Sequence, residues 1–149
     1  MTKKRTGDPW MSAAEYGRGM PAFTVNLIVA DVARSLRFYA EVLGAETLYS
    51  DEDFAALRLA GLDFMLHADH TYDHHPLYGR LSEGRTRGAG AELRLLGIDP
   101  DRVQKRALSF GAEVLQPAGD RGHAWRDVIV ADPDGYTWAV GVLLPPLSS

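Results

Sequence analysis

A five-residue pattern occurs twice in this chain, and the repeat limits what the chain can fold into. Residues 44–48 read Gly-Ala-Glu-Thr-Leu, and residues 111–115 read Gly-Ala-Glu-Val-Leu. Each copy follows a stretch whose apolar residues recur at helical spacing, beginning at Asp31 in the first half and at Asp99 in the second. We therefore expect two copies of one small structural unit.

Each half is predicted to form a strand, a helix and three further strands. Alternating apolar residues predict the first strand of each half, at Thr24–Ala30 and Ala91–Leu96. Asp31 and Asp99 are good helix N-caps, and Gly44 and Gly111 are expected to end the helices. The remaining strands are predicted at about 45–50, 53–60 and 62–68, and at about 113–118, 124–131 and 136–143. The fold class is therefore α+β, with two tandem βαβββ modules.

The domain and module boundaries follow from the order of the predicted strands and helices. One domain at 23–143 is expected, with modules at about 23–68 and 89–143, a polar connector at 69–88 and a tail at 144–149. Residues 1–22 form an N-terminal arm that glycines and prolines interrupt. The arm is either a flexible leader or packed on its own body or a partner subunit. Packing is favoured because Trp10, Met11 and Tyr16 would be unusual if exposed together.

Composition excludes several classes of function. The net charge of −4 argues against nucleic-acid and anionic-membrane partners, and no apolar run is long enough to cross a membrane. The chain has no cysteine, which excludes disulfides, thiolate catalysis and cysteine-bound zinc. A cytoplasmic location is expected.

Two motifs, together with the repeat, resemble the vicinal oxygen chelate superfamily, which includes glyoxalase I, extradiol dioxygenases, fosfomycin resistance enzymes and bleomycin resistance proteins. The segment Asp31-Val-Ala-Arg-Ser-Leu-Arg-Phe-Tyr39, with Val42-Leu-Gly44 after it, is similar to the family's first helix. The segment Asp132-Pro-Asp-Gly-Tyr136 is similar to its last turn. The resemblance covers about residues 23–143. It implies two curved mixed sheets around a cavity.

Metal-dependent members of that family place one ligand at each of four cavity-facing positions. By the family's offsets these positions are Thr24, Met65, Glu92 and Ala139. Only Glu92 is a competent ligand for a divalent ion, which needs three or four protein ligands in a catalytic site. The resemblance therefore implies no metal site at these positions, and we expect no cofactor.

Other polar residues are predicted to face the cavity by strand alternation. Asn26, Glu92 and Arg94 point the same way as Thr24, and each must be paired or solvated. A structural Glu92–Arg94 pair and a set of contacts for a ligand are equally consistent with the pattern. Either Trp125 or Arg126 points inward, so Trp125 is a cavity wall or a core or interface residue. Trp138 is expected to face the helix.

Four histidines lie close together near the end of the first half, at positions 67, 70, 74 and 75. Solvated or hydrogen-bonded loop histidines are the commonest explanation of such a cluster. A ligand-contacting cluster at the cavity mouth and a metal site are the alternatives. His70 and His74 would share one face of a helix, but Pro76 follows at once.

The sequence favours a non-enzymatic homodimer, similar to bleomycin resistance proteins, that binds a small aromatic or cationic drug or natural product. The alternative is a metal-independent lyase or isomerase with Glu92 as its general base, a role that His67 could also fill. A metal-dependent glyoxalase or dioxygenase is the third hypothesis. The predicted ligand-binding residues are Thr24, Asn26, Met65, His67, Glu92, Arg94, Trp125 and Ala139.

Overall fold

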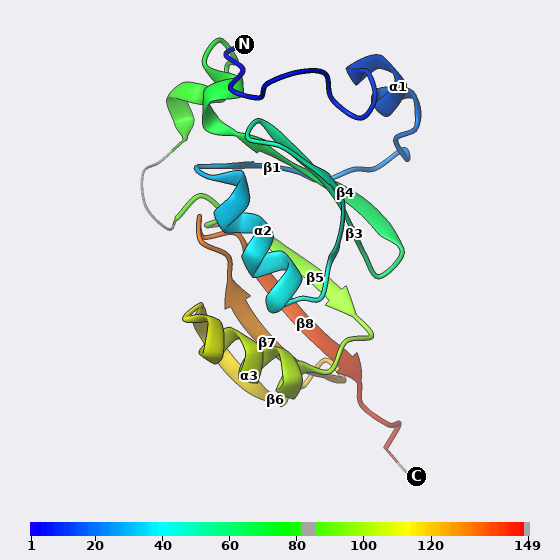
Figure 1. Ribbon diagram of the computed structural model, residues 1–149. Coiled ribbons are helices and arrows are strands. Elements are labelled where there is room, and N and C mark those ends of the chain that lie inside the picture. The colour runs from blue at the N-terminus through cyan, green and yellow to red at the C-terminus, as the bar shows by residue number, and fades with distance from the viewer. Residues whose placement is uncertain (82–85, 148–149) are drawn as a thin grey trace. The chain divides into compact units, whose positions relative to one another are not determined.

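A computed structural model describes residues 1–81 and 86–147 and contains two four-stranded mixed sheets (Figure 1). The chain divides into two compact units. The first contains residues 1–36 and 45–81, and the second contains residues 37–44 and the described residues from 86 onward. Parts of the predicted connector and tail, at 82–85 and 148–149, lie outside the described residues. No helix within the described ranges is long and apolar enough to span a membrane.

The sheet of the first unit has the order β1-β4-β3-β2. Its strands are β1 (Asn26–Val29), β2 (Glu46–Ser50), β3 (Phe54–Leu59) and β4 (Leu62–Ala68). Strand β1 pairs in parallel with β4, and the other pairs are antiparallel. The α+β class and the mixed sheets predicted from the sequence are confirmed. Thr24, expected inside the first strand, lies just before it.

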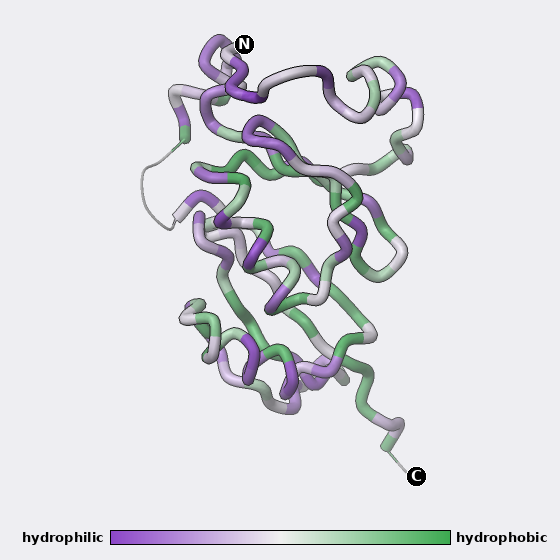
Figure 2. Tube along the Cα trace, viewed as in Figure 1, coloured by the Kyte–Doolittle hydropathy of each residue, from purple (hydrophilic) through white to green (hydrophobic). Residues whose placement is uncertain are grey.

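One face of this sheet is apolar and buried, as the alternation of its residues predicts. Figure 2 shows hydrophobic residues along the strands of this sheet. Leu27, Leu66 and Leu57 lie on this face and are each 5% exposed or less. Asn26, Met65 and His67 lie on the opposite face, where Asn26 is paired with Met65 across the β1–β4 ladder. The polar side chains of β1 and β4 are therefore gathered on one face.

The second unit repeats this arrangement with the order β5-β8-β7-β6. Its strands are β5 (Glu92–Leu96), β6 (Glu113–Asp120), β7 (Trp125–Ala131) and β8 (Thr137–Leu143). Helix α3 (Pro100–Phe110) packs on this sheet through Val103 and Ala107, which are fully buried. The Asp99 side chain caps α3 by accepting from the Asp101 N–H, and Gly111 follows the helix in the left-handed conformation, with φ of 83°.

A buried hydrogen bond joins the two sequence motifs. Helix α2 (Val32–Glu41) carries Tyr39, whose hydroxyl donates to Asp132 Oδ2 at 2.6 Å. The other oxygen of Asp132 accepts from the N–H groups of Asp134 and Tyr136, at 2.9 Å each. Trp138 Nε1 donates to the Tyr39 hydroxyl at 3.2 Å, and Trp138 is a buried core residue, as predicted. The helix and the turn are thus held together through their defining residues.

Because of Asp132, we expect stability to fall as the pH rises from about 4 to about 6. Burial raises the pKa of the Asp132 carboxyl to about 6, although its hydrogen bonds oppose this rise. In the unfolded chain the pKa of aspartate is about 3.9. Between these values the unfolded chain releases a proton that the folded chain keeps, so ionisation favours unfolding, by about 3 kcal/mol at most.

Urea unfolding at several pH values in this window tests that expectation. The free energy of unfolding should fall more steeply with pH in the wild type than in Asp132→Asn, whose side chain does not titrate. All other ionisable groups are the same in both proteins, so their contribution cancels in the comparison. Parallel pH profiles for the two proteins would show that the pKa of Asp132 in the folded chain is that of an ordinary aspartate.

Candidate functional site

The N-terminal arm packs against the polar face of the first sheet. It contains a short helix, α1 (Ala13–Arg18). The sequence did not predict this helix, because glycines and prolines interrupt the arm. Trp10 stacks on Tyr49 of β2, with ring centroids 5.4 Å apart and an interplanar angle of 8°. Tyr16 meets Phe54 of β3 edge to face at 5.1 Å. Trp10 and Tyr16 of the arm therefore make aromatic contacts with the sheet of the same unit.

Asp53, directly before β3, fastens the beginning of the arm. Its carboxylate accepts from the backbone N–H groups of Lys4, at 2.7 Å, and Arg5, at 3.3 Å, and from His70 Nε2 at 2.7 Å. The side chain is almost completely buried. Burial raises the pKa of this carboxyl, but the hydrogen bonds from His70, Lys4 and Arg5 outweigh it, so the pKa lies below its usual value. Asp53 is therefore a charged anchor for the arm.

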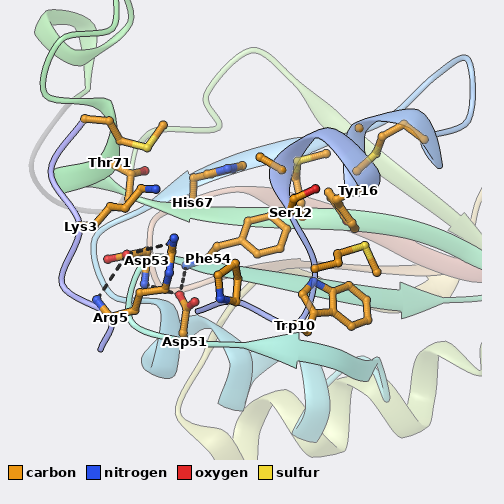
Figure 3. A pocket seen from close by; sticks show the side chains of 17 residues that line it. Lys3, Arg5, Trp10, Ser12, Tyr16, Asp51, Asp53, Phe54, His67 and Thr71 are labelled. Carbon is orange, nitrogen blue, oxygen red and sulfur yellow. Dashed lines mark hydrogen bonds and ion pairs between the residues drawn. The ribbon is translucent and has the colours of Figure 1, made fainter. Parts of the chain in front are cut away.

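A cavity of about 440 Å³ lies in the first unit between the arm and the sheet (Figure 3). The sheet and its loops contribute polar and apolar side chains, namely Asp51, Asp53, Phe54, Met65, His67 and Thr71. The arm contributes the rest, namely Met1, Lys3, Arg5, Pro9, Trp10, Met11, Ser12, Ala13, Tyr16, Gly17 and Met20. The walls are mainly apolar and aromatic, with the charged residues gathered near Asp53. This composition is typical of small-molecule sites.

His67 is held in one orientation by a chain of hydrogen bonds. Its Nδ1 lies 2.7 Å from Asn26 Oδ1, and Asn26 Nδ2 donates to the Tyr72 hydroxyl at 2.6 Å. Because an amide oxygen only accepts, Nδ1 of His67 carries the proton. The ring also packs edge to face on Phe54 at 4.9 Å. Burial lowers the pKa of His67, so the imidazole is neutral at pH 7.

Tyr16 brings a second polar group to the cavity. Its hydroxyl is buried and has no hydrogen-bond partner among the described residues. Burial, and then the charge of Asp63, raise the pKa of Tyr16, so the hydroxyl keeps its proton. A buried hydroxyl without a partner costs about 1–3 kcal/mol, which a bound ligand or water would offset.

Of the eight predicted ligand-binding residues, only Met65 and His67 line this cavity. Asn26 is hydrogen-bonded to His67 but does not line the cavity itself. The Thr24 hydroxyl donates to the Pro21 carbonyl oxygen at 3.3 Å. The other four belong to the second unit. There Ala139 is paired with Arg94 across the β5–β8 ladder, and Met65 is paired with Asn26 in the same way in the first sheet. Met65 and Ala139, two of the positions inferred from the resemblance, therefore occupy equivalent places in the two modules.

The polar residues of the second sheet are already paired with one another. Arg94 Nη1 donates to Glu92 Oε1 at 3.0 Å, and its guanidinium carbon lies 4.6 Å from the centre of the Trp125 ring. Arg94 Nη2 lies 3.1 Å from His123 Nε2. Trp125 thus shares the face of Glu92 and Arg94, whereas Arg126 faces α3 and pairs with Asp101 at 2.7 Å. Glu92 is 40% exposed and borders an open depression of about 500 Å³.

The four neighbouring histidines have separate environments. His67 lies on β4, His70 bonds Asp53, and His74 is mostly exposed beside Asp73. His75 accepts from the Leu77 N–H at 3.1 Å through Nδ1. In residues 1–81 and 86–147, no group of three histidine, aspartate or glutamate side chains is placed to hold a metal ion.

Sequence reasoning missed most residues of this cavity. It noted Trp10, Met11 and Tyr16 as apolar but did not assign them to a site, and it did not single out Asp53 or Phe54. The signal for the arm was the set of large apolar residues within a segment rich in glycine and proline. Nothing in the sequence pointed to Asp53, because its partners are the His70 side chain and the backbone N–H groups of Lys4 and Arg5, all distant along the chain.

The comparisons with known proteins agree with this fold. Residues 22–140 match the family model for the Glyoxalase/Bleomycin resistance protein/Dioxygenase superfamily. An uncharacterised protein of Mycobacterium tuberculosis is 32% identical over 129 residues, which cover 81% of this chain and 74% of that protein.

Two solved structures share the fold at low identity. A glyoxalase-related enzyme from Fulvimarina pelagi superposes with a TM-score of 0.66 at 19% identity, over 82% of this chain and 87% of that one. A fosfomycin resistance protein from Listeria monocytogenes gives a TM-score of 0.61 at 21% identity, over 82% of this chain and 92% of that one.

Proposed function

We propose that this chain, which belongs to the Glyoxalase/Bleomycin resistance protein/Dioxygenase superfamily, binds a small aromatic molecule without metal chemistry. The ligand occupies the cavity of about 440 Å³ between the arm and the first sheet. The observation that supports this proposal most strongly is the aromatic and thioether lining of that cavity. Trp10, Phe54 and Met65 offer flat, polarizable surfaces to a planar ligand.

A cationic ligand is less favoured than a neutral aromatic one. The acidic residues of the cavity are Asp51 and Asp53, and both already accept hydrogen bonds. Asp51 accepts from the Tyr49 hydroxyl at 2.7 Å, and Asp53 accepts from His70 and the arm. Lys3 and Arg5 also line the cavity and would repel a cation. Of the two ligand types expected from the sequence, we therefore retain the aromatic one.

The donor chemistry at the family's metal positions supports a metal-free function. Thr24 offers a hydroxyl, Met65 a thioether and Ala139 nothing. The carboxylate of Glu92 is bonded to Arg94. Such a set does not fit a catalytic divalent ion, which needs three or four oxygen or nitrogen ligands. The same pairing with Arg94, and its exposure, make Glu92 a poor general base for a metal-independent lyase or isomerase.

A thermal-shift screen of neutral and anionic aromatic compounds tests the proposal. A ligand present at 100 times its dissociation constant should stabilise the protein by about 2.7 kcal/mol, which is several degrees in melting temperature. Aliphatic compounds of similar size serve as controls. If no aromatic compound raises the melting temperature at saturating concentration, the cavity is not a binding site of this kind.

The homodimer, the cytoplasmic location and a role in antibiotic resistance stay predictions. Light scattering on the purified protein tests the first of them, since a single species of about 33 kDa is expected for two copies of the 16.4 kDa chain. A monomer at micromolar concentration would contradict it.

A further inference from the structure

His67 offers the cavity a hydrogen-bond acceptor that the protein itself does not use. Its Nδ1 proton is given to Asn26, so Nε2 carries a lone pair. No described residue is bonded to Nε2, although the ring lines the cavity. Figure 3 shows the His67 side chain among those that line the cavity, near Phe54.

The orientation of this acceptor is fixed rather than free. Asn26 is itself held by the Tyr72 hydroxyl, which accepts from Asn26 Nδ2 at 2.6 Å, and Tyr72 also packs against the His67 ring at 5.5 Å. Phe54 packs against the same ring at 4.9 Å. A fixed acceptor in an apolar cavity selects ligands by their donors, because a buried acceptor left without a donor costs free energy.

We propose that the cavity takes aromatic molecules that carry a hydroxyl group, whose proton is donated to Nε2 of His67. This inference rests on the proposed function and names the ligand class for the same cavity. The Tyr16 hydroxyl, buried without a partner, supplies a second polar contact to the ligand. The aromatic rings of Trp10 and Phe54 hold the ligand's ring, and the two polar groups set its orientation. The phenolic hydroxyl is thus the part of the ligand that is recognised specifically.

Two probes that differ in one hydrogen-bond donor test this inference. Titration calorimetry should show that 1-naphthol binds the wild type about ten-fold more tightly than its methyl ether, 1-methoxynaphthalene, because the ether leaves Nε2 without a donor. In His67→Phe the preference should disappear while both probes still bind. His74→Phe is the matched control, since His74 is exposed and does not line the cavity, and it should keep the full preference.

The tautomer of His67 gives a readout that needs no variant. Nitrogen-15 NMR of the imidazole should show Nδ1 protonated and Nε2 unprotonated. A protonated Nε2 at pH 7 would overturn the inference, because that nitrogen would donate instead of accept. Equal affinity of the wild type for the two probes would overturn it as well, yet would leave the aromatic binding site standing. If neither probe binds and no aromatic compound stabilises the protein, the inference and the proposed function both fail.

Discussion

Tyr39→Ala is expected to lower the free energy of unfolding by about 4 kcal/mol, a large part of the stability of an ordinary domain. Tyr39 is fully buried, and its ring packs edge to face on Phe38 at 5.1 Å and on Trp138 at 5.7 Å. Its removal leaves a cavity and also removes the hydrogen bonds that Tyr39 makes with Asp132 Oδ2 and Trp138 Nε1. Urea unfolding monitored by circular dichroism measures the loss.

Tyr39→Phe separates the hydrogen bonds from the packing. This variant keeps the ring and should lose about 1–3 kcal/mol, because the buried hydrogen bonds of the Tyr39 hydroxyl with Asp132 and Trp138 are removed. Tyr78→Ala is the matched control, since Tyr78 is 47% exposed, and it should change stability by less than about 0.5 kcal/mol. If Tyr39→Phe is as stable as the wild type, the hydrogen bond between the two motifs contributes nothing.

Trp10→Ala is expected to weaken the binding of 1-naphthol at least about ten-fold. Trp10 forms the aromatic wall that the arm contributes, and its loss removes both apolar contact area and ring stacking for the ligand. Trp10→Phe should retain most of the affinity. Titration calorimetry on the purified variants gives the dissociation constants.

The other tryptophan outside the core provides the control for this result. Trp125 lies on the second sheet, next to Arg94, and does not line the cavity under the arm. Trp125→Ala should therefore leave the affinity for 1-naphthol unchanged. A loss of binding in Trp125→Ala, with none in Trp10→Ala, would move the site to the second sheet.

The sequence predicted the modules well because their signals are local. Asp99, Pro100 and Gly111 mark the ends of α3 within a few residues, and the alternation of β1 and β5 assigns each side chain to a face. The Asp-Pro-Asp-Gly turn was also predicted from the sequence, and Gly135 adopts the positive φ, 91°, that such a turn requires. These features depend on neighbours in the chain.

The cavity was not predictable in the same way, because it depends on contacts between distant segments. His67 becomes an oriented acceptor only when β4 pairs with β1, which brings Asn26 within 2.7 Å from 41 residues away. Helix α1 has six residues, none of which is buried as a whole, so its sequence carries little helical signal of its own. The arm is placed by Asp53 and by aromatic stacking, which are tertiary contacts.

The three tryptophan indole N–H groups allow the most direct test of the central claim, that aromatic molecules bind between the arm and the first sheet. Trp10 lines the cavity, Trp125 lies on the second sheet, and Trp138 is in the core, bonded to Tyr39. On titration with 1-naphthol, the NMR signal of the Trp10 indole should shift strongly, while those of Trp125 and Trp138 stay nearly unchanged. A shift confined to Trp125, or no shift at saturating probe, would contradict the account.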